Sequence, residues 1–111
     1  MTYNLAMVFI ETPVFTRLVE ELLPHDSYAG LQHVLLLRPD TGNVIPGSGG
    51  LRKVRWGSDQ KGKRSGLRLI YYWDKPDDVI YMLFAYRKGE REDLTSEQIK
   101  SLRRLIKEYL E

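Results

Sequence analysis

The sequence predicts one α+β domain in the order β-α-α-β-β-β-α, with helices packed on one face of a small, mostly antiparallel sheet. Residues 5–37 begin with a short apolar run, typical of a buried strand, and continue with apolar residues at helical spacing. Residues 51–86 change to the spacing of two that is typical of strands, and residues 96–110 return to helical spacing. A chain of 111 residues is long enough for one core and too short for two. We therefore expect a single domain over residues 1–111.

The first two elements follow from local signals. Residues 5–10 form a continuous apolar run, which predicts a buried strand. Thr12 followed by Pro13 supplies an N-cap and a proline for the first helical position. The apolar residues that follow recur at helical spacing until Pro24, so a helix is expected between these two prolines.

A second helix and a loop come next. Asp26 or Ser27 can cap this helix, and Pro39 ends it. Residues 40–50 then combine turn-forming residues with glycine and proline, so a loop is expected there.

The alternating part of the chain begins after this loop. Lys53 and Arg55 fall on one face of a strand over 51–56, with Arg52, Val54 and Trp56 on the other. The remaining expected elements are a basic hairpin loop over 57–66, strands over 67–73 and 79–86 with a turn over 74–78, and a last helix opened by the capping box Thr95–Gln98.

Positive charge is concentrated in the middle of the chain. The net charge of +2 divides into −3 over residues 1–50, +6 over 51–91 and −1 over 92–111. Within 51–73 there are seven basic residues and one acidic residue, Asp59. A solvated basic surface is the plainer explanation. Because the charges lie in strand-like segments that would place them on one face, we favour a polyanionic partner.

Several classes of protein are disfavoured by what the sequence contains. His25 and His33 are eight residues apart on roughly one face of the second helix, so we expect ordinary helix positions instead of a catalytic pair. No cysteine and no carboxylate cluster is present, so neither a metal site nor a cofactor is expected. Residues 47–50 are rich in glycine, but they lead into a strand and lack the Walker spacing, which disfavours nucleotide hydrolysis. Binding of an RNA phosphate by the backbone N–H groups of this segment remains an alternative.

No segment points to a membrane or to export. The longest apolar runs are far shorter than the roughly 18 residues of a membrane span, and the first residues lack the features of a secretory signal. The absence of cysteine fits a reducing compartment. We expect a cytoplasmic protein with no membrane partner.

The basic segment suits one reaction in particular. RNA supplies its own nucleophile, the 2′-hydroxyl, so cleavage needs a proton acceptor, cations that neutralise the phosphorane, and a proton donor for the leaving oxygen. Clustered lysines can move protons because neighbouring positive charge disfavours their protonated form, and arginines bind phosphate oxygens in pairs. Tyr72 and Tyr86 could stack on bases, although packing within the strands is the favoured interpretation for each.

Three segments give the chain a family resemblance. They are GSGGLRKVR at 47–55, KGKRSGLRLIYY at 61–72 and YRKGEREDL at 86–94. Together they resemble the RelE/ParE superfamily, in its HigB branch, whose pattern combines a glycine-rich R-K segment, a basic loop leading into R-x-I-Y-Y, and a late Y-x-K-x-E segment. The element order expected above is also that of a RelE-like fold.

The resemblance implies a toxin of a type II toxin–antitoxin system, an endoribonuclease that cuts mRNA in the A site of the 30S ribosomal subunit. It implies a cognate HigA-like antitoxin with a helix-turn-helix domain, bound over the basic face of the sheet or along an exposed element such as an edge strand. Catalytic roles would fall to four residues on and after the strands: Lys53, Arg55, Arg68 and Lys88. RNA-binding roles would fall to a second set: Arg52, Lys61, Lys63, Arg64, Tyr72 and Arg91.

The sequence departs from RelE near its end. Leu94 and Thr95 stand where RelE has a tyrosine that contributes to the reaction, and Gly89 replaces a basic residue. The general base therefore stays open between Lys53, the first choice, and Lys88. Two alternatives also remain: a ParE-like inhibitor of DNA gyrase, which lacks this set of basic residues on its strands, and a non-catalytic RNA-binding module.

Overall fold

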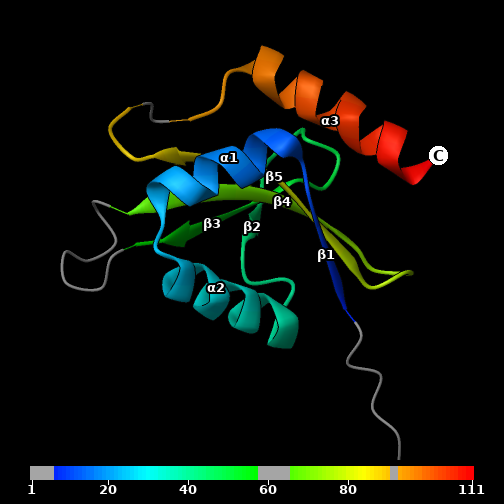
Figure 1. The fold of residues 1–111 in the computed structure, drawn as a ribbon. Coiled ribbons are helices and arrows are strands. Elements are labelled where there is room, and N and C mark those ends of the chain that lie inside the picture. Colours follow the sequence, from blue (N-terminus) through cyan, green and yellow to red (C-terminus); the bar gives the residue numbers. More distant parts are fainter. Residues whose placement is uncertain (1–6, 58–65, 91–92) are drawn as a thin grey trace, which may run out of the picture.

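The computed structural model describes residues 7–57, 66–90 and 93–111 and confirms the predicted α+β class (Figure 1). Five strands form one sheet in the order β1-β5-β4-β3-β2. The chain runs through β1 (Val8–Glu11), α1 (Pro13–Leu22), α2 (His25–Leu37), β2 (Asn43–Val44), β3 (Arg52–Trp56), β4 (Leu67–Asp74), β5 (Val79–Arg87) and α3 (Ser96–Leu110). Strands β2 to β5 pair in antiparallel fashion, whereas β1 lies parallel to β5 at the edge.

Helices α1 and α3 begin where the sequence predicts. The Thr12 hydroxyl accepts a hydrogen bond from the backbone N–H of Phe15 at 3.0 Å, with Pro13 in the first turn. At the other end of the chain, Thr95 and Gln98 form the predicted capping box.

Helix α2 begins two or three residues earlier than expected. Pro24 occupies the cap position, and no side chain caps the helix, so the predicted caps Asp26 and Ser27 lie inside its first turn. The carbonyl of Pro24 accepts the N–H of Tyr28 at 3.0 Å. A proline with an extended backbone can therefore end α1 and start α2 without a polar cap.

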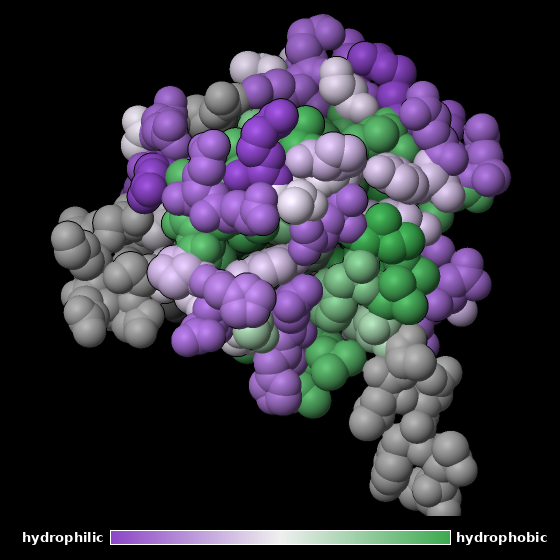
Figure 2. All heavy atoms as spheres, in the orientation of Figure 1, coloured by the Kyte–Doolittle hydropathy of each residue, from purple (hydrophilic) through white to green (hydrophobic). Residues whose placement is uncertain are grey.

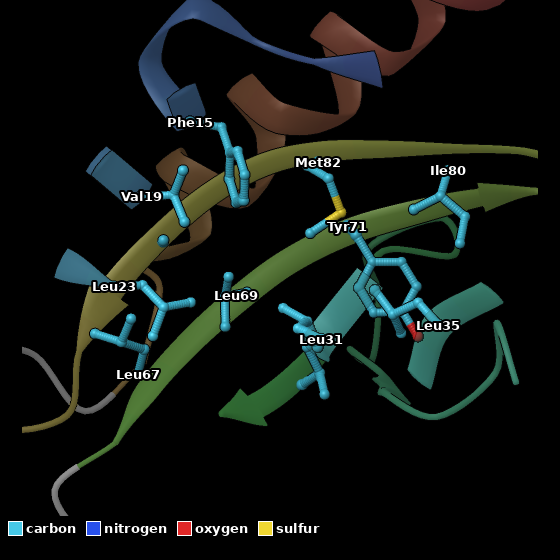
Figure 3. Close-up of a cluster of buried hydrophobic side chains, with 12 residues drawn as sticks. Phe15, Val19, Leu23, Leu31, Leu35, Leu67, Leu69, Tyr71, Ile80 and Met82 are labelled. Carbon is cyan, nitrogen blue, oxygen red and sulfur yellow. The ribbon is translucent and has the colours of Figure 1, made fainter. Parts of the chain in front are cut away.

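The first core lies between one face of the sheet and helices α1 and α2 (Figure 3). In that view the side chains of Phe15, Val19 and Leu31 point from the helices toward the strands. Leu69 and Tyr71 of β4 meet them from the sheet and are 0% exposed. Burial of such side chains stabilises the fold by roughly 1.5–3 kcal/mol each.

Helix α3 covers the opposite face, so the prediction that the helices share one face is wrong. Ile106 of α3 packs into a second cluster with Leu51, Ile70, Tyr81 and Leu83. The reason lies in β4 and β5, where consecutive residues are apolar and both faces of the strands need cover. Ile70 is as fully buried on this face as Leu69 is on the other.

The loop after α2 contains a short strand that the sequence analysis did not predict. In β2, Asn43 pairs with Lys53 and Val44 with Arg52. Gly42 allows this close approach: a Cβ atom there would lie 2.9 Å from both the Lys53 carbonyl oxygen and the Tyr71 ring. The N–H of Gly42 donates to the Tyr71 hydroxyl at 2.9 Å, which fixes the loop over the sheet.

The surface in Figure 2 is mostly polar, with an apolar area at the right over the position of β1. Val8 of β1 is 49% exposed there. Edge strands with such surfaces can pair with further strands. In the part of the chain that the structure describes, no helix combines the length and apolar character needed to cross a membrane.

Candidate anion-binding site

Three of the predicted catalytic residues and Tyr86 lie on one face of the sheet. Arg55 of β3 pairs with Arg68 of β4, which pairs in turn with Tyr86 of β5. Paired residues on neighbouring strands point to the same face and lie about 5 Å apart. Lys53 lies two residues from Arg55 and so on the same face. We call Lys53, Arg55 and Arg68 the cationic row.

Lys88 lies just past the end of β5. Its backbone N–H donates to the Gly66 carbonyl at 3.2 Å, so the pairing with β4 continues to this residue. Because Lys88 is two residues beyond Tyr86, its side chain starts from the same face as the cationic row. Arg68 lies on the strand between the two lysines, with Lys53 on the β3 side and Lys88 on the β5 side.

Arg68 is unusual because it is charged and almost fully buried, at 6% exposure. Its one described hydrogen bond is a long one, from Nη1 to the Leu67 carbonyl at 3.4 Å. Among the residues that the structure describes, no carboxylate forms an ion pair with it. A buried cation without a counter-charge lowers stability, and a bound anion would remove that cost.

Lys53 forms an ion pair that the sequence analysis did not anticipate. Its Nζ lies 2.9 Å from Oδ1 of Asp93. The hydrogen bond and the positive charge of Lys53 lower the pKa of the Asp93 carboxyl below its usual value. The two residues are 40 positions apart, and no local pattern indicates their contact.

Two grooves flank Lys53. The first, with a volume of about 410 Å³, runs between the segment after Gly42 and the start of α3. It is lined by Asn43, Val44, Ile45, Pro46, Lys53, Tyr86, Asp93, Leu94 and Ile99. The second groove, also of about 410 Å³, is lined by Thr41, Asn43, Lys53, Val54 and Arg55. Asn43 and Lys53 line both grooves.

Two other predicted RNA-binding residues lie away from the cationic row. Arg52 points to the opposite face, where its guanidinium donates to the carbonyls of Asp40 at 3.3 Å and Gly42 at 2.7 Å. Tyr72 shares the face of Arg68 but lies four residues along β4, about 13 Å away. There it packs against Gly50, where an added Cβ would lie 3.1 Å from the Tyr72 ring.

The remaining predicted contacts, Lys61, Lys63, Arg64 and Arg91, lie outside the described residues. Over the described ranges, no three His, Asp or Glu side chains come together as metal ligands. The described side chains on this face offer ammonium, guanidinium, carboxylate, amide and phenol groups.

Comparison with known proteins identifies the fold. No family model matches the chain. Among solved structures, it is similar to the toxin RelE of E. coli, determined as a double arginine-to-alanine mutant in the free state. The TM-score is 0.61 at 20% sequence identity, over 86% of this chain and 97% of that chain. The chain therefore has the RelE-like fold that its sequence resemblance implies.

Proposed function

We propose that the protein is a toxin of a type II toxin–antitoxin system and an endoribonuclease that needs no metal ion. The main support is Arg68, a buried guanidinium without a described carboxylate partner, set between Arg55 and Tyr86. Such a group favours an anion with paired oxygens, and the phosphodiester of RNA is one. The RelE-like fold and the sequence resemblance add to this support.

The proposed reaction is transesterification within the RNA. The 2′-oxygen attacks the adjacent phosphorus and loses its proton to a base, while the bond from phosphorus to the 5′-oxygen breaks and that oxygen gains a proton. The products are a 2′,3′-cyclic phosphate and a 5′-hydroxyl. Arg55 and Arg68 neutralise the charge that develops on the phosphorane.

Proton transfer falls to the two lysines beside Arg68, Lys53 and Lys88. The Lys53 ammonium is already in an ion pair with Asp93 at 2.9 Å. We therefore assign Lys53 the role of the acid that protonates the leaving 5′-oxygen, and Lys88 the role of the base. This reverses the preference that the sequence alone gave.

The proposed substrate is mRNA in the A site of the ribosome, in the cytoplasm. A cognate antitoxin, HigA-like and with a helix-turn-helix domain, would bind the toxin and silence it. These finer assignments rest on the sequence resemblance to the HigB branch. The exposed edge of β1 is a surface where a partner segment can add a strand.

Induced expression in cells, followed by mapping of RNA 5′ ends, tests the proposal. The wild-type chain should arrest growth and produce cuts linked to codon position, with 5′-hydroxyl ends. The double variant Lys53→Ala, Arg55→Ala should lose cutting by at least about 100-fold while keeping its melting temperature. Arg17→Ala is the matched control, because Arg17 lies exposed on α1, on the other side of the sheet.

Three outcomes would contradict the proposal. Intact transcripts with DNA damage would indicate gyrase inhibition instead. RNA binding that weakens with salt but never leads to cleavage would indicate a binding module. Full toxicity of the double variant would show that the cationic row is not the active site.

A further inference from the structure

Two neighbouring side chains hold the loop before β2, and both lie on the side of the sheet away from the cationic row. Arg52 and Tyr71 are paired across β3 and β4, so their side chains start about 5 Å apart. Tyr71 is 0% exposed and belongs to the first core (Figure 3). We call Arg52 and Tyr71 the loop clamp.

The loop clamp binds backbone atoms of the loop through four described hydrogen bonds. The Arg52 guanidinium donates to the carbonyls of Gly42 at 2.7 Å and Asp40 at 3.3 Å. The Tyr71 hydroxyl donates to the Pro39 carbonyl at 2.6 Å and accepts the N–H of Gly42 at 2.9 Å. Gly42 is therefore held through both its N–H and its carbonyl. The two bonds from the guanidinium are charge-assisted, and such bonds are stronger than neutral ones.

We propose that the loop clamp positions the proposed ribonuclease site, and that Arg52 acts through the loop and not by touching RNA. The inference rests on the proposed function. It gives Arg52 a role different from the RNA contact that the sequence resemblance implies, and it adds Tyr71, which the sequence analysis did not single out.

The loop that the clamp holds lies against the proposed catalytic residues. Asn43 directly follows Gly42 and pairs with Lys53, so the clamp fixes the chain one residue before this pairing. Without β2, the strand that carries Lys53 would be an edge strand of the sheet. The second groove is lined by Thr41 and Asn43 of this segment and by the two cations of β3. The clamp therefore sets how close the loop stands to two of the cations proposed to surround the phosphate.

The direction of the Arg52 side chain distinguishes positioning from RNA contact. Arg52 alternates with Lys53 along β3, so its guanidinium lies on the other face of the sheet. Its Nη1 atom already donates to two carbonyls there. To reach a phosphate at the cationic row, the guanidinium would have to release both carbonyls and cross to the opposite face.

The experiment measures cleavage and binding separately for Arg52→Ala. The kcat for cleavage of ribosome-bound mRNA should fall about 10- to 100-fold, because a displacement of about 1 Å in a positioned group can cost about 100-fold. Binding of a non-cleavable 2′-deoxy RNA should stay within about twofold of the wild type, with the same dependence on salt. Arg55→Ala, by contrast, should weaken this binding and lower the slope of log affinity against log salt by about 0.7, the value for one phosphate contact with a single strand.

A second variant tests whether the two clamp residues act as a unit. Tyr71→Phe keeps the ring in the core and removes the hydroxyl that binds Pro39 and Gly42. It should lower kcat about threefold to tenfold, again without a change in RNA binding. The double variant should lose less than the product of the two separate effects, since both side chains hold one loop. A general loss of folded protein would instead lower binding and cleavage together.

Controls separate this inference from the proposed function. Arg17→Ala removes an exposed arginine from α1 and should leave kcat and the salt dependence at wild-type values. If the wild type cuts RNA and the Lys53→Ala, Arg55→Ala variant does not, the proposed function holds. An unchanged kcat in Arg52→Ala would then overturn the inference alone, and so would a loss of salt dependence equal to that of Arg55→Ala. No cutting by the wild type would overturn both.

Discussion

Replacement of Arg68 by methionine should leave stability unchanged or raise it, and should strongly reduce activity. Arg68 is 6% exposed and has no carboxylate partner within the described ranges. Methionine keeps an apolar stem of similar length and removes the buried charge. Exchange of a buried charge for an apolar group is often neutral or stabilising, so we expect a gain of about 0–2 kcal/mol in the free energy of unfolding.

The loss of activity can be estimated from the contacts that Arg68 would make with phosphate. A hydrogen bond to a charged group contributes about 1.5–3 kcal/mol, and a guanidinium can make two in parallel. Removing about 3–4 kcal/mol of transition-state stabilisation lowers kcat/KM by about 100- to 1,000-fold.

Thermal unfolding and cleavage of ribosome-bound mRNA measure the two effects separately. The melting temperature of Arg68→Met should stay level or rise by up to about 8 °C, since about 1 kcal/mol shifts a domain of this size by about 4 °C. Arg17→Met, an arginine-to-methionine change at an exposed position on α1, should retain activity. A variant of Arg68 that melts several degrees lower and still cuts mRNA would show that the arginine is structural and that the reasoning is wrong.

Two further predictions concern ion pairs and pH. Asp93→Asn removes the carboxylate that competes with RNA for Lys53. Binding of a non-cleavable 2′-deoxy RNA should therefore tighten about threefold at low salt, and should not change at about 0.5 M salt, where the ion pair is screened. Weaker binding of this RNA by the variant would contradict the prediction. The Tyr28 hydroxyl donates to Glu11 at 2.5 Å, and burial together with the Glu11 carboxylate raises the pKa of Tyr28 far above its usual value. Tyr28→Phe should therefore cost about 1–2 kcal/mol at pH 7 in urea unfolding. Because folding raises the pKa of Tyr28, its hydroxyl contributes fully to the free energy of unfolding below about pH 10, and this contribution is lost as the pH rises further. The wild type should therefore lose stability faster than Tyr28→Phe between about pH 9 and 11.

The sequence predicts most of the elements because their signals are local. The Thr12 cap and the Thr95–Gln98 capping box each involve residues three positions apart, and both form as expected. The alternation over β3 also places Lys53 and Arg55 on one face with Val54 on the other, as predicted. Such features depend on backbone geometry within a single element.

Features that depend on pairing between distant segments could not be predicted in this way. The ion pair between Lys53 and Asp93 and the placement of β2 beside β3 depend on how the loops cross the sheet. The position of α3 on the second face follows from apolar residues on both sides of β4, which the sequence analysis took as evidence for a strong strand only. Arg52 alternates away from Lys53, and its two carbonyl partners lie in the loop before β2, which was predicted as a loop but not as a neighbour of Arg52.

The parallel pairing of β1 with β5 has a consequence for the order of folding. The Thr12 hydroxyl donates to the Leu83 carbonyl, a contact that joins residues 71 positions apart. Closing a loop of that length costs entropy before any contact is gained, whereas the pairing of β4 with β5 needs only a short turn. We expect the antiparallel hairpin to form first and the N-terminal segment to dock on it afterwards. Arg68 and Tyr86 would then be side by side in the transition state for folding, before the chain has a complete core.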